Sequence, residues 1–72
     1  MNFITVFNSN QSFQISIVKN LFDREKINYR IPDEFMDSAA GIGGLGINGM
    51  HVQVLEEDVM RAKVILKDAG FN

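Results

Sequence analysis

The fold is decided by residues 50–58, which read Met50-His51-Val52-Gln53-Val54-Leu55-Glu56-Glu57-Asp58. The first six alternate apolar and polar side chains, the pattern of a β-strand with one buried and one solvated face. The acidic run that follows stands where a helix N-terminus favours negative charge. Residues 50–55 are therefore predicted to form a strand that leads directly into a helix.

The predicted C-terminal helix is amphipathic. Its apolar face consists of Val59, Ala62, Ile65, Leu66 and Ala69. Lys63 and Lys67 lie toward its C-terminal half, where cations are favoured. Gly70 is well placed to adopt the left-handed conformation that ends many helices.

The N-terminal half predicts a strand and a second helix. Residues 3–7 are β-branched or aromatic throughout, as in a largely buried strand, and residues 8–10 favour a turn and a helix cap. The helix is predicted from about Asn10 to Arg24. A helical wheel places five apolar residues on one side: Phe13, Ile17, Val18, Leu21 and Phe22.

Residues 27–31 alternate as a further strand, which Pro32 ends because proline donates no ladder hydrogen bond. Residues 1–72 thus form a single βαββα domain. A right-handed crossover makes the first two strands parallel, so we expect residues 50–55 between them and antiparallel to both. The fold class is α+β, a ferredoxin-like sandwich lacking its last strand, with a three-stranded sheet of order 1-3-2 and two helices on one face. The first strand is then an open edge, which proteins cover or use for pairing.

Three segments carry a family resemblance: Ile4-Thr5-Val6-Phe7, Leu21-Phe22-Asp23-Arg24-Glu25-Lys26-Ile27 and Val52-Gln53-Val54-Leu55-Glu56-Glu57-Asp58-Val59-Met60-Arg61-Ala62. Across nearly its whole length the chain resembles short bacterial domains of unknown function described as putative prokaryotic signal-transducing proteins. This resemblance implies a PII-like, ferredoxin-like fold and a regulatory rather than catalytic role. The sequence departs from the family pattern at Lys26, where a helix-ending Gly is usual, and its central loop lacks the usual Pro-rich and Trp-bearing segment.

A Gly-rich loop at residues 32–49 connects the second and third strands, and residues 41–49 hold five of the six glycines. Residues 41–46 and 44–49 each match G-x-G-x-x-G. A dinucleotide site needs a helix directly after that motif, whereas a strand follows here. Ile42, Leu45 and Ile47 gain free energy only if they are buried, either on the domain's own sheet or in a partner. Sensing of a small ligand or nucleotide by this loop is kept as the alternative function.

His51 is the single histidine, and Asp33, Glu34 and Asp37 precede it in the loop. Imidazole and carboxylates suit several divalent ions, but a polar residue on the outer face of an alternating strand needs no ligand. No metal, cofactor or catalytic residue is predicted, and we expect the protein not to be an enzyme.

The uncovered face of the sheet is the main candidate surface. If Ile4 and Val6 face the helices, then Phe3, Thr5 and Phe7 face away, forming an apolar patch that a monomer rarely exposes. In the opposite register both phenylalanines face inward. The predicted contact residues for a partner or ligand are Phe3, Thr5, Phe7, Gly41, Ile42, Gly43, Gly44, Leu45, Gly46 and His51.

Composition narrows the class of protein. The net charge of −2 with dispersed basic residues argues against nucleic acid, and no apolar stretch approaches the roughly 18 residues of a membrane span. The absence of cysteine and of a basic segment before an apolar run favours the cytoplasm. A chain of 72 residues is marginally stable alone, which favours a homo-oligomer or a protein partner. The sequence thus predicts a small non-catalytic regulatory or adaptor module that acts by protein–protein interaction.

Overall fold

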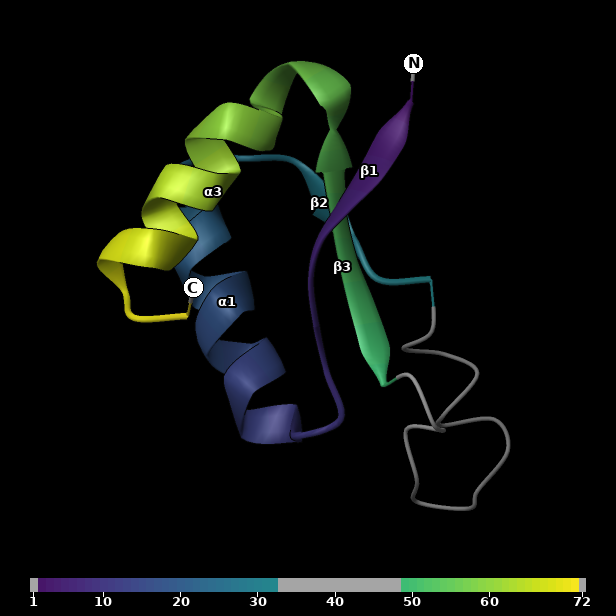
Figure 1. Ribbon diagram of the computed structural model, residues 1–72, viewed down its shortest axis with the longest axis vertical. Helices are drawn as coiled ribbons and strands as arrows, with labels where there is room; N and C mark the ends of the chain where they lie inside the picture. Colours follow the sequence, from purple (N-terminus) through teal and green to yellow (C-terminus); the bar gives the residue numbers. More distant parts are fainter. Residues whose placement is uncertain (1, 33–48, 72) are drawn as a thin grey trace.

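A computed structural model of the protein describes residues 2–32 and 49–71. Its elements are β1 (Phe3–Ser9), α1 (Ser12–Arg24), β2 (Tyr29–Arg30), β3 (Met50–Leu55), a 3-10 turn (Glu56–Asp58) and α3 (Val59–Asp68) (Figure 1). The predicted βαββα order is confirmed. β3 has its predicted bounds, whereas β2 is limited to the middle of the predicted segment.

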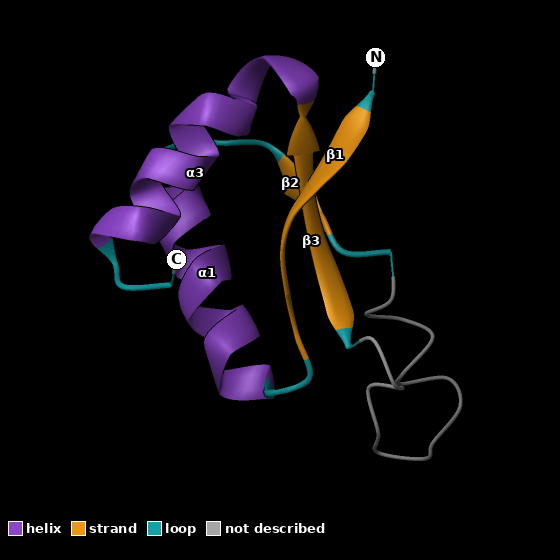
Figure 2. Cartoon of the chain, in the orientation of Figure 1, coloured by secondary structure: helices purple, strands orange, loops and turns teal. Residues whose placement is uncertain are grey.

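The three strands form one sheet of order β1-β3-β2, in which β3 pairs antiparallel with both neighbours. The two helices cover one face of this sheet (Figure 2). No helix or strand in residues 2–32 and 49–71 covers the other face, which we call the open face. This is the predicted α+β arrangement, with β1 at one edge and β2 at the other.

A β-bulge interrupts the pairing of β1 with β3. Phe3 pairs with Leu55 and Thr5 with Gln53, but Phe7 then pairs with Val52. The extra residue reverses the alternation of the side chains that follow it. Phe3 and Thr5 therefore face away from the helices as predicted, whereas Phe7 faces them and packs against the core. The prediction that Phe7 belongs to the open face is wrong.

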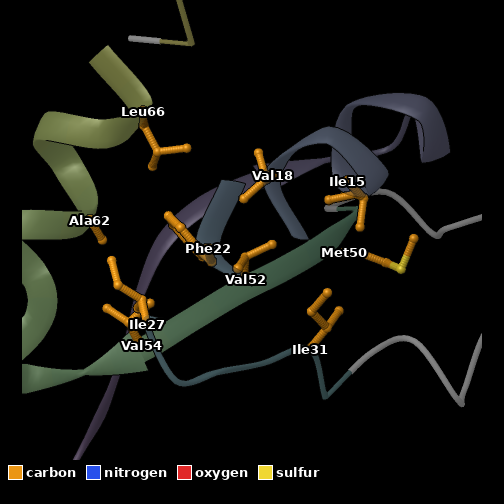
Figure 3. Packing of buried hydrophobic residues seen from close by; sticks show 10 residues of the cluster. All are labelled: Ile15, Val18, Phe22, Ile27, Ile31, Met50, Val52, Val54, Ala62 and Leu66. Atoms are coloured by element: carbon orange, nitrogen blue, oxygen red, sulfur yellow. The ribbon is translucent and has the colours of Figure 1, made fainter. Parts of the chain in front are cut away.

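The core lies between β3 and the two helices (Figure 3). Phe22, Val18, Val52 and Val54 are its largest fully buried side chains. Among the described residues, the buried set is Ile15, Val18, Phe22, Ile27, Ile31, Met50, Val52, Val54, Ala62 and Leu66.

The buried face of α1 differs from the predicted one. Phe13 and Ile17 are 61% and 42% exposed, while Ile15 is buried. The apolar residues of α1 span an arc wider than the sheet and α3 can cover, so tertiary packing selects the part of the arc that contains Ile15, Val18 and Phe22.

Both helices end in a Schellman motif. At the end of α3, Phe71 N–H donates to the Leu66 carbonyl, and Gly70 adopts φ +87°, as predicted. At the end of α1, Ile27 N–H donates to the Phe22 carbonyl, and the left-handed residue is Lys26, with φ +60°. Lys26 thus adopts a conformation that glycine usually occupies at the end of a helix.

Gly49 leads into β3 next to the end of β1. Its φ is +72°, and a Cβ built there would lie 2.6 Å from the backbone carbonyl of Ser9. Only glycine fits this contact without a backbone shift. Ser9 also fixes the following turn, because its Oγ accepts a hydrogen bond from Gln11 N–H and donates one to Gln14 Oε1.

Candidate functional site

The open face of the sheet carries a row of polar side chains that crosses all three strands. Arg30 Nε on β2 donates to Gln53 Oε1 on β3 at 2.9 Å. Gln53 Nε2 in turn donates to Thr5 Oγ1 on β1 at 3.2 Å. We call these three residues the polar ladder. Because it lies on the outer surface, water competes for each of its hydrogen bonds.

Phe3 lies beneath the polar ladder at the N-terminal end of β1. The guanidinium carbon of Arg30 stands 4.4 Å from the centre of the Phe3 ring, in cation–π geometry. Phe3 is therefore half-buried rather than exposed. Since Phe7 faces the helices, the predicted patch of two exposed phenylalanines does not form.

Phe7 has a different role from the predicted one. Its ring packs edge-to-face against Phe71, with the ring centres 5.3 Å apart. Phe71 follows the Schellman end of α3, so this contact ties the C-terminal segment to β1. Next to it, an open hollow runs along β1, lined by Thr5, Val6, Phe7, Asn8 and Phe71.

The remaining predicted contact residues fall into two groups. His51 is half-buried on β3 and pairs with Asn8 of β1, on the open face. Gly41, Ile42, Gly43, Gly44, Leu45 and Gly46 lie outside the described residues, as do the carboxylates Asp33, Glu34 and Asp37. Within residues 2–32 and 49–71, no group of three or more His, Asp and Glu side chains is placed to hold a metal ion.

The most exposed large apolar side chains lie elsewhere. On the helices they are Phe13, Ile17, Met60 and Val64, and on β1 the side chain of Ile4 is 39% exposed. The wheel of α1 placed Phe13 and Ile17 in the core, so sequence reasoning missed these two as surface residues. Ile4 faces the helix side because it pairs with buried Val54, yet its position on the edge strand leaves it accessible.

A comparison with protein families identifies the chain. A family model described as "putative prokaryotic signal transducing protein" matches residues 3–70. The chain belongs to this family. No curated protein and no solved structure matches the chain.

The predicted family resemblance is thus confirmed, and this signal-transducing family is described by a role in signalling rather than by a reaction. The relation to PII proteins stays a prediction. In the described part of the chain, neither helix is long and apolar enough to cross a membrane.

Proposed function

We propose that this member of the signal-transducing family is a non-catalytic regulatory or adaptor module that acts by protein–protein interaction through edge strand β1. A second copy of the chain, giving a homo-oligomer, is the first partner to test. We place the module in the cytoplasm, which suits a chain without cysteine.

The observation that carries the proposal is the state of the β1 edge. β1 has seven residues, pairs on one side with β3, and contains neither a charged residue nor a proline. Charged residues and proline are the common means of blocking an edge strand. The single protective feature on β1 is the bulge at Thr5 to Phe7. The bulge restricts which strands can pair but leaves the edge available.

The surroundings of β1 support the same proposal. The hollow beside Thr5 to Asn8 gives an added strand room along the edge. On the helix side, Ile4 is exposed, and an added strand would remove its side chain from water. Strand addition supplies backbone hydrogen bonds, while neighbouring pockets select the side chains of the partner.

The test replaces Ile4 with glutamate, because a charge on an edge strand opposes pairing. The matched control is Met60→Glu, since Met60 is an apolar residue of α3 with 81% exposure. We expect light scattering to show association of the wild-type chain and of M60E from micromolar to millimolar concentration, and a monomer for I4E.

A partner other than a second copy is detected by placing a photo-crosslinking amino acid at Asn8, an exposed position on β1. In the native host, this position should form a crosslink to a protein, and I4E should abolish it while M60E preserves it. A chain that stays monomeric and forms no I4E-sensitive crosslink at Asn8 would contradict the proposal.

A further inference from the structure

The space beside β1 is lined by two parts of the molecule. β1 itself contributes Thr5, Val6, Phe7 and Asn8, and Phe71 closes the end near Phe7. α3, the helix before Phe71, packs against β1 and β3 and therefore lies on the helix side of this space (Figure 1). We call this space the edge slot. It is the place where an added strand would pair with β1 while facing the helix layer.

The flank of α3 above the edge slot is positively charged. Ala62 and Leu66 face the core. Ile65, Asp68 and Ala69 line a hollow together with Leu21 of α1, so they face α1. With 100° between successive residues, Lys63 and Lys67 then fall on the opposite flank of α3, one turn apart, and both are exposed.

A third cation lies on the other side of the same strand. The Arg30 guanidinium reaches across the open face to the Phe3 ring of β1. The edge is thus flanked by Lys63 and Lys67 on the helix side and by Arg30 on the open side. β1 carries no charged residue, and the acidic Asp68 lies on the α1 flank of α3. Glu56 and Glu57 lie beside Asn2, at the opposite end of β1 from Phe7 and Phe71.

We infer that the edge slot binds an extended acidic segment of a partner protein, which adds to β1 as a fourth strand with carboxylates facing Lys63 and Lys67. The inference rests on the proposed function and names the chemistry of the partner. Alternate residues of a strand point to opposite faces. A segment that alternates acidic and apolar residues therefore places all its carboxylates on one face, where they can meet Lys63 and Lys67.

Charge complementarity favours this partner over a second copy. The β1 of another molecule is Phe3–Ser9, which brings no carboxylate to the edge slot. Self-pairing would leave the lysines of both copies without acidic partners. The net charge of −2 moreover repels acidic peptides in general, so their binding requires a local cationic surface such as this one.

The test titrates two synthetic octapeptides into the isotope-labelled full chain and follows backbone amides by NMR. One peptide alternates glutamate with valine, and the other alternates lysine with valine. We expect the glutamate peptide to shift the amides of residues 5–8 and of α3, with weaker binding at high salt. The lysine peptide should produce no such shifts.

Two variants distinguish binding at the edge slot from nonspecific attraction between charges. The double substitution Lys63→Gln and Lys67→Gln should weaken binding of the glutamate peptide about tenfold, because two exposed charges are lost. The control is Arg24→Gln, which removes a cation from the last turn of the other helix. It should leave the affinity unchanged, and the spectra of all variants should retain the native fold.

A third peptide tests strand addition itself. A glutamate peptide that is N-methylated at every residue keeps its charge but has no backbone N–H left to donate ladder hydrogen bonds along either edge, so it should not bind. Equal binding of the N-methylated peptide would overturn the inference. So would equal binding of the glutamate peptide to the wild-type chain and to the variant that lacks Lys63 and Lys67. Self-association through β1 that the glutamate peptide does not displace overturns the inference and leaves the proposed function intact. Failure of both peptide binding and the Asn8 crosslink removes both proposals.

Discussion

On the helix side of β3, the side chains of Met50, Val52 and Val54 are buried, whereas on the other side those of His51, Gln53 and Leu55 are half-buried. Neighbouring residues of one strand are therefore held by different forces. The inner set depends on close packing, which tolerates little change of volume. In the outer set, Gln53 makes hydrogen bonds to Arg30 and Thr5 in the presence of water, where each contributes little.

This difference makes the stability of the fold depend mainly on one face of the sheet. A small domain of 72 residues has roughly 4–11 kcal/mol of stability in total. Most of it must come from the inner face, where apolar area is removed from water. We therefore expect substitutions on the outer face to change the free energy of unfolding much less than substitutions on the inner face.

Phe22→Ala should have the largest effect on stability. Phe22 is 0% exposed and lies between α1 and β3. Loss of a buried phenylalanine costs about 3–5 kcal/mol, because the burial and the packing around the cavity are both lost. Urea unfolding followed by circular dichroism should show a midpoint far below that of the wild-type chain, or a chain unfolded without denaturant. A loss below about 1 kcal/mol would mean that the core is not centred on this residue.

Phe3 and Phe7 of β1 allow the buried and open faces of the sheet to be compared within a single strand. Phe7→Ala should cost about 2 kcal/mol, since it removes a half-buried ring and its edge-to-face contact with Phe71. Phe3→Ala should cost about 1 kcal/mol or less, because it removes a half-buried ring and a cation–π contact at the surface. Unfolding in urea measures both. Equal losses would mean that the bulge does not send the two rings to different faces.

The sequence predicts those elements whose local pattern agrees with their final environment. The alternation of residues 50–55 is a local signal, and β3 has the predicted bounds. Gly70 likewise ends α3 in the predicted left-handed conformation, which glycine adopts without steric cost. The turn preference of residues 8–10 is a weaker signal, because Asn8 and Ser9 pair with β3 and α1 begins at Ser12 instead of Asn10.

The bulge in β1 could not be predicted, because residues 3–7 are all β-branched or aromatic. No feature of their sequence indicates which residue will be left without a pairing partner on β3. Pairing with β3 determines that residue. The exposure of Phe13 and Ile17 likewise depends on how much of α1 the rest of the molecule covers. For the candidate site, periodicity correctly placed Phe3, Thr5 and His51 on the open face. Only the folded sheet brings Arg30 over Phe3.

Gln53→Leu should have the smallest effect on stability, although it breaks both hydrogen bonds of the polar ladder. Water can solvate the Arg30 guanidinium and the Thr5 hydroxyl once the amide is gone, so neither is left buried without a partner. The leucine side chain is close in size to glutamine and suits a strand surface. We therefore expect a loss of no more than about 1 kcal/mol in urea unfolding. A double-mutant cycle with Thr5→Val should then give a coupling of a few tenths of a kcal/mol, as for an exposed pair. A loss above about 2 kcal/mol would place the ladder among the determinants of folding and remove the distinction between the two faces of β3.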